Sequence, residues 1–134
     1  MGVRVGQKEK CKMEDVRYFF DSYAVIELLK ENPSYARFKD EQITITVFSL
    51  AEIYWCFLLE DENTAEKVYE KFKKSVILFG DEILKEAMKF RKQNKKQNLS
   101  YADCIGYTYA LKHKIIFLTG DKEFSGFKNV EFVK

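Results

Sequence analysis

The sequence predicts an α/β domain with a mainly parallel central sheet. Short apolar segments rich in β-branched and aromatic residues alternate along the chain with longer segments of helical periodicity. This alternation is typical of strands joined by helical crossovers. The chain has 134 residues, of which 46% are hydrophobic and 16% aromatic, which suits one core and one domain. Its single proline and six glycines leave no linker rich in either residue.

The first half of the chain alternates strand and helix signals. The aromatic and β-branched segment 16–20 (VRYFF) favours a buried strand. Apolar residues at helical spacing follow, and Pro33 suits the first turn of a second, short helix. The predicted elements are, in order, a strand at 16–20, a helix at 22–31, a short helix at 34–40 and a strand at 43–47.

The second half continues this pattern with longer helices. Residues 49–60 are apolar almost throughout, so one sheet cannot cover every face of that helix, and we expect another helix or a partner chain against it. The predicted elements are, in order, helices at 49–60 and 62–74, a strand at 75–78, helices at 81–97 and 100–112, a strand at 115–118, a loop at 119–126 and an edge strand at 130–133.

Residues 1–15 differ from the rest of the chain because they are mostly polar and carry little periodicity. We expect a flexible N-terminal arm there and one domain over 16–134. No apolar run approaches the ~20 residues that a membrane span needs, and the N-terminus lacks the apolar core of a signal peptide. The sequence therefore predicts a cytoplasmic protein with no membrane segment.

The cysteine and histidine content excludes several kinds of site. The three cysteines, Cys11, Cys56 and Cys104, show no paired spacing, which argues against a disulfide framework or a zinc ribbon. The only histidine, His113, leaves little for a His-based zinc site or a Ser-His-Asp triad. A net charge of +2 does not mark the whole chain as a nucleic-acid binder.

Four acidic residues lie in unusually apolar surroundings. Asp21 and Asp121 follow apolar strands, Glu52 is the only polar residue in LAEIYWCFLL, and Asp103 is the only charge in YADCIGYTYAL. A carboxylate in apolar surroundings is destabilising unless it is paired, hydrogen-bonded or bound to a metal. Convergence of the four on one Mg²⁺ or Mn²⁺ ion would satisfy all of them, because hard cations prefer oxygen ligands.

Taken one at a time, the same acids also fit ordinary structural roles. Ser49 and Glu52, and likewise Ser100 and Asp103, have the spacing of a helix capping box. Acids in a first helical turn are favoured by the helix dipole, and an Asp after a strand can simply be a turn residue. The functional interpretation therefore depends on the set of four and not on any single member.

The four acids and their neighbours resemble the PIN-domain family, and most closely the small VapC-type toxin ribonucleases. The matching segments are FFDSYAVIELL at Asp21, TVFSLAEIYW at Glu52, LSYADCIGYTYA at Asp103 and FLTGDKEF at Asp121. Their order, residue types and spacing are similar to that family over nearly the whole of 16–134. The resemblance implies a three-layer α/β/α sandwich, in agreement with the predicted order of elements.

The resemblance also implies an activity. It makes the four acids both catalytic and metal-binding residues for Mg²⁺ or Mn²⁺ in a ribonuclease that cleaves single-stranded RNA. It suggests auxiliary roles in the cluster for Ser22 and Thr119. Glu123 stands where the family often carries an Asp and is a third candidate for an auxiliary role.

Partners follow from the same resemblance. It implies a homodimer and a cognate antitoxin protein, with this chain as the toxin of a type II toxin–antitoxin pair. Relatives also act in RNA maturation and quality control, so an RNA-processing nuclease is an alternative. A catalytically inactive module that binds RNA or protein is another.

A basic segment directly precedes the third acid. Residues 85–97 carry six basic residues and one acid, which suits a polyanionic strand held by its phosphates. The candidate RNA-binding residues are Arg91, Lys92, Lys95 and Lys96. A solvated, lysine-rich helix face would give the same pattern.

Two other enzyme classes fit the acids less well. A phosphoryl-acceptor receiver domain would need an acidic pair after its first strand, and it would leave Glu52 unexplained. A phosphatase of the haloacid-dehalogenase type would need a second Asp at position 23, where this chain has Tyr23.

Overall fold

The computed structural model describes residues 17–134 and contains one four-stranded sheet in which every neighbouring pair of strands is parallel. The strands are β1 (Tyr18–Phe20), β2 (Ile43–Thr44), β3 (Ile116–Thr119) and β4 (Val130–Phe132), in the spatial order β2-β1-β3-β4. This confirms the predicted α/β class, with β4 at one edge of the sheet.

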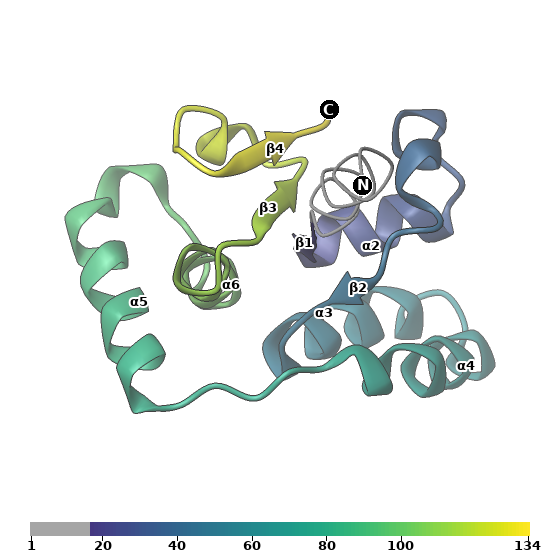
Figure 1. Ribbon diagram of the computed structural model, residues 1–134. Coiled ribbons are helices and arrows are strands. Elements are labelled where there is room, and N and C mark those ends of the chain that lie inside the picture. The colour runs from purple at the N-terminus through teal and green to yellow at the C-terminus, as the bar shows by residue number, and fades with distance from the viewer. Residues whose placement is uncertain (1–16) are drawn as a thin grey trace, which may run out of the picture.

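Helices cover both faces of the sheet (Figure 1). In chain order they are α2 (Ser22–Leu29), η1 (Pro33–Phe38), α3 (Val47–Leu58), α4 (Glu62–Phe72), η2 (Lys73–Ser75), α5 (Asp81–Gln93), η3 (Lys95–Gln97), α6 (Tyr101–Lys112) and η4 (Lys122–Phe124), where η denotes a 3₁₀ helix. In Figure 1, α5 and α6 lie on one side of the strands, and α2, α3 and α4 lie on the other.

Alternation along the two central strands divides the core in two. Phe19 and its register partner Phe117 pack with residues of α5 and α6, whereas Phe20 and its partner Leu118 pack with residues of α2, α3 and α4. Successive side chains of a strand point to opposite faces, so each face acquires its own hydrophobic core. The arrangement confirms the three-layer α/β/α sandwich.

Close packing of α6 on the sheet depends on a glycine. A Cβ atom at Gly106 would lie 2.5 Å from Cε1 of Phe19, well inside van der Waals contact. The glycine therefore lets α6 approach β1, and this approach places the start of α6 near the carboxyl end of the sheet.

Several predicted boundaries differ from the structure. The predicted strand 43–47 is only β2 (Ile43–Thr44), and the predicted helix 49–60 begins earlier, at Val47, and ends at Leu58. Residues 75–78 are not a strand, because only Val76 forms a bridge, to Ile45. The predicted helix 81–97 stops at Gln93, and the separate turn η3 follows and ends at Asn98 in the left-handed conformation. The predicted loop 119–126 contains the short helix η4.

The predicted N-terminal arm at 1–15 and Cys11 lie outside the described residues, so the division into 1–15 and 16–134 stays a prediction. Over residues 17–134, none of the helices combines the length and the apolar character that crossing a membrane requires.

Candidate active site

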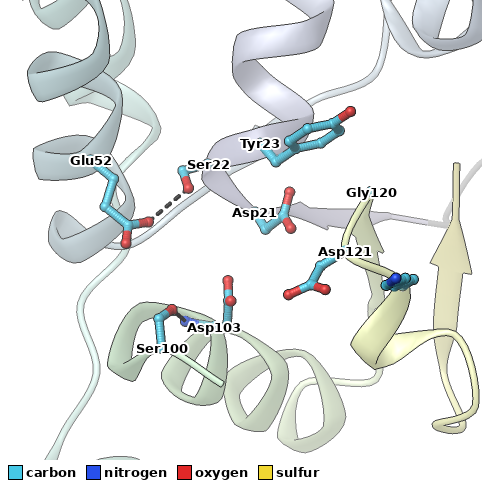
Figure 2. Close-up of a pocket in the computed structure, with 9 residues that line it drawn as sticks. Asp21, Ser22, Tyr23, Glu52, Ser100, Asp103, Gly120 and Asp121 are labelled. Atoms are coloured by element: carbon cyan, nitrogen blue, oxygen red, sulfur yellow. Dashed lines mark hydrogen bonds between the residues drawn. The ribbon is translucent and has the colours of Figure 1, made fainter. Parts of the chain in front are cut away.

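The carboxyl ends of the adjacent parallel strands β1 and β3 open into a pocket of about 440 Å³ (Figure 2). All four of the predicted acids line it, and they reach it from the ends of both strands and from helices α3 and α6. The lining residues are Asp21, Ser22, Tyr23, Glu52, Ser100, Asp103, Gly120, Asp121 and Lys122.

Asp21 is the most deeply buried of the four acids, with 4% of its surface exposed. It caps the N-terminus of α2, where its Oδ1 accepts a hydrogen bond of 2.7 Å from the backbone N–H of Ala24. The pKa of Asp21 is raised to about 8, mainly by burial and also by the negative charges of Asp103 and Asp121, while the hydrogen bonds from Thr119 and Ala24 oppose the shift. A capping role and a place in the acidic pocket thus coexist in one residue.

Thr119 connects two of the acids from beneath the pocket. Its fully buried hydroxyl donates to Oδ2 of Asp21 at 2.5 Å and accepts from the backbone N–H of Asp121 at 3.0 Å. The structure therefore places Thr119 where the sequence predicts it, inside the cluster. Its hydroxyl thereby links the carboxyl of Asp21, after β1, to the turn that follows β3.

Glu52 lies in the second turn of α3 and is oriented by the start of α2. The hydroxyl of Ser22 donates to Oε1 of Glu52 at 2.7 Å, as Figure 2 shows. The capping-box interpretation of Glu52 is wrong, because the N-cap of α3 is Thr46, whose hydroxyl accepts from the N–H of Ser49. Glu52 therefore has no capping function that would explain its position in an apolar helix.

Asp103 lies in the first turn of α6, where Ser100 is the N-cap and accepts from the N–H of Asp103 at 3.0 Å. Burial raises the pKa of the Asp103 carboxyl to about 6, hydrogen bonding to Ser100 opposes the shift, and the charges of Glu52 and Asp121 add to it. Because three of the acids influence one another in this way, the metal-free pocket disfavours full ionisation.

Asp121 projects from the turn between β3 and η4. Its Oδ1 accepts from the backbone N–H of Glu123 at 2.9 Å and caps η4. The side chain of Glu123 is exposed and does not line the pocket. The structure thus brings Asp121 into the cluster but relates Glu123 to it only through the backbone.

Four lining residues were missed as site residues by sequence reasoning: Tyr23, Ser100, Gly120 and Lys122. Lys122 carries the one positive charge among the described residues that line the pocket. Its position next to Asp121, in a turn that follows a strand, is the only sequence signal that could have drawn attention to it.

The donor set fits a hard divalent cation. The described lining residues offer carboxylate and hydroxyl oxygens and no histidine or cysteine. Within residues 17–134, no three Asp, Glu, His or Cys side chains are close enough together to form a ready-made metal cage. An ion that keeps several of its own waters, as Mg²⁺ does, suits such an open set of ligands.

The basic segment lies beside the acidic pocket in the chain. Lys92, Lys95 and Lys96 are exposed, and Arg91 is partly buried. A second cavity, of about 240 Å³, is lined by Arg91, Asn94, Lys95, Asn98 and Leu99. Leu99, which lines this cavity, directly precedes Ser100, which lines the acidic pocket.

Comparison with known families agrees with this fold. The family model of the PIN domain matches residues 18–131 of this chain. The chain belongs to the PIN domain family. PIN domains are generally nucleases that use divalent metal ions, and the four acids of this PIN domain line a pocket at the carboxyl ends of its parallel strands, where α/β folds bind their ligands.

Solved structures share the fold of this PIN domain at low sequence identity. A toxin–antitoxin complex from Klebsiella pneumoniae is 18% identical, with a TM-score of 0.65 over 85% of this chain and 95% of that one. PAE2754 from Pyrobaculum aerophilum is 20% identical, with a TM-score of 0.65 over 88% and 90%. VapBC2 from Rickettsia felis, bound to a DNA fragment from its promoter, is 15% identical, with a TM-score of 0.65 over 89% and 100%. No curated protein sequence matches the chain.

Proposed function

We propose that this PIN domain is a Mg²⁺- or Mn²⁺-dependent endoribonuclease that cleaves single-stranded RNA and acts in the cytoplasm as the toxin of a type II toxin–antitoxin pair. The observation that carries the proposal is the meeting of Asp21, Glu52, Asp103 and Asp121 in one pocket. The raised pKa values of Asp21 and Asp103 support it, because perturbed carboxyls in a cleft are typical of functional sites.

The acids divide into two groups in this proposal. Asp21, Asp103 and Asp121 would hold the cation, directly or through water, and Glu52 would ligate it or orient the attacking water. A bound divalent ion supplies a more acidic water and withdraws charge from the phosphate oxygens. The chain's own contribution is orientation, since Thr119 fixes Asp21 and Ser22 fixes Glu52 through the hydrogen bonds described above.

Asp103→Asn tests the activity. The substitution keeps the side-chain shape and the N–H bond to Ser100 but removes a charged ligand, so we expect loss of Mn²⁺-dependent RNA cleavage with the fold retained. Asp40→Asn is the matched control, because Asp40 is exposed and lies outside the pocket. Cleavage by Asp103→Asn at the wild-type rate would contradict the assignment, and wild-type protein that binds RNA without cleaving it would favour the inactive module.

A second copy of the chain is proposed to cover α3. Three apolar side chains on α3 and at its C-cap stay largely exposed, Val47 at 54%, Trp55 at 61% and Leu59 at 68%. Exposed apolar surface of this kind is typical of an association site. A strictly monomeric sedimentation profile would contradict the dimer.

A cognate antitoxin is proposed as the second protein partner. Two of the solved structures with this fold, the Klebsiella complex and VapBC2, are toxin–antitoxin assemblies. A gene for a small DNA-binding protein beside the gene for this chain would support the toxin assignment. Its absence would favour an RNA-processing role.

A further inference from the structure

Tyr101 is an exposed aromatic residue that directly follows Ser100, a lining residue of the acidic pocket. It is the first residue of α6, directly between the cap Ser100 and the helical turn that holds Asp103. Its side chain is on the surface, with 58% of the residue exposed. A single exposed aromatic residue is ordinary on a protein surface, so its significance depends on what lies against it.

The guanidinium of Arg91 covers one face of this ring. Its Cζ atom lies 4.4 Å from the ring centroid of Tyr101, within the range of a cation–π contact. The Nε–H of Arg91 donates to the carbonyl oxygen of Leu99 at 2.9 Å, which pins the guanidinium in this orientation. Since one face of the ring is covered, the exposed surface of Tyr101 belongs mainly to the other face and the ring edge.

The remaining donors of Arg91 have no acidic partner among residues 17–134, where it forms no salt bridge. Arg91 also lines the cavity of about 240 Å³ together with Asn94, Lys95 and Asn98. An arginine fork in a basic, amide-lined hollow suits a phosphate group, because its parallel N–H donors match two phosphate oxygens.

We propose that Tyr101 and Arg91 form a platform for single-stranded RNA, in which an unpaired base stacks on the free face of Tyr101 and a neighbouring phosphate binds Arg91 in the adjacent cavity. Base stacking on an aromatic ring combined with arginine contacts is the usual physical basis of single-strand binding. This proposal depends on the proposed function in one respect only, namely that the ligand is RNA. Tyr101 is next in the chain to Ser100, which lines the acidic pocket.

Two features favour RNA over an acidic protein as the ligand. The platform offers a ring face, which a stacked base fills better than a carboxylate side chain does. The positive charge also continues along η3 through Lys95 and Lys96, which suits a chain of regularly spaced phosphates. Both features lie on the segment that leads into Asp103.

The test measures affinity for a short, unstructured single-stranded RNA by fluorescence anisotropy in EDTA, so that no cleavage occurs. Tyr101→Leu is expected to weaken binding roughly 5- to 150-fold, the range measured for loss of one stacked base. Tyr101→Phe keeps the ring and is expected to bind as the wild type does. Tyr69→Leu is the matched control, because Tyr69 is an exposed tyrosine, at 37%, on α4.

Two further measurements separate stacking from charge. Tyr101→Leu is expected to leave the salt dependence of binding unchanged, whereas Arg91→Gln is expected to reduce the logarithmic slope by about 0.7. An abasic sugar–phosphate strand of the same length is expected to bind wild type and Tyr101→Leu equally, because it has no base to stack.

Unchanged RNA affinity in Tyr101→Leu would overturn the platform, and so would an equal loss in Tyr69→Leu or equal competition by polyglutamate. These outcomes do not depend on catalysis. RNA that binds through Tyr101 but is not cleaved in Mn²⁺ would refute the proposed nuclease activity and leave the platform standing. RNA that is cleaved in Mn²⁺ while Tyr101→Leu binds it as tightly as the wild type does would refute the platform and leave the proposed nuclease activity standing.

Discussion

Replacing Asp21 with Asn tests whether the buried carboxyl destabilises the metal-free protein. The amide can keep the local hydrogen bonds, because its oxygen accepts from the N–H of Ala24 as Oδ1 of Asp21 does now. Its NH₂ group can donate to Oγ1 of Thr119, which reverses the present bond, in which the Thr119 hydroxyl donates to Oδ2 of Asp21. Because the effect of this reversal does not depend on pH, the pH dependence of stability isolates the loss of a titrating group.

The magnitude follows from the difference in pKa between the two states. In the unfolded chain Asp21 titrates near its ordinary value of 3.8, and in the folded protein near about 8. Between these values the folded state holds a proton that the unfolded state has lost, so the free energy of unfolding decreases as the pH rises. The slope is at most about 1.4 kcal/mol per pH unit, or roughly 3 kcal/mol over two units. The contribution of the Asp21 proton to the free energy of unfolding is complete at low pH and is lost as the pH rises through about 8.

The assay is urea unfolding followed by circular dichroism, in EDTA, at several values between about pH 5 and pH 7. We expect the stability of the wild type to fall more steeply with pH than that of Asp21→Asn, so that the variant gains relative stability as the pH rises. Asp103, whose pKa is also raised, to about 6, contributes a decrease in both proteins. Parallel stability curves for the two proteins would refute the reasoning, because they would mean that Asp21 is ionised in the folded state at all these pH values.

Two further predictions concern the basic segment and the loop after β3. Lys95→Ala combined with Lys96→Ala removes two exposed charges next to the second cavity, and we expect it to weaken RNA binding and to reduce its logarithmic salt slope by about 1.4 in a salt titration. Gly120→Ala would place a Cβ atom 2.1 Å from Cε1 of Tyr23. We expect it to lower the free energy of unfolding by about 1–3 kcal/mol, measured in urea, because the ring must move.

The order of elements could be predicted because each helix and central strand carries its own periodicity. The predicted strand at 75–78 failed for a reason that no local pattern contains. Its residues favour a strand, but only Ile45, beyond the end of β2, is available to pair with Val76. Pairing depends on what lies alongside in space, and the sequence does not state this for the edge of a sheet.

The residues of the candidate site likewise divide into those that the sequence marks and those that only the fold brings to the pocket. Asp21, Glu52, Asp103 and Asp121 could be found because a charge in an apolar segment stands out in the sequence. Lys122 could not, because an exposed lysine in a turn looks like any other, and only the fold turns it toward the pocket. The same holds for Tyr101, whose significance depends on an arginine ten residues away in the chain.

The acidic pocket and the basic segment carry charges of opposite sign, and they would act differently on RNA. In the part of the chain that the structure describes, the pocket gathers four acids around a single basic side chain, Lys122, so those acids that are ionised repel a phosphate chain. Affinity for RNA must then come from outside the pocket, and Arg91 and Tyr101 are placed to supply it. Binding and cleavage should therefore be separable in this protein. In EDTA the platform should bind RNA without cleavage, and cleavage should require a divalent ion that offsets the charge of the acids.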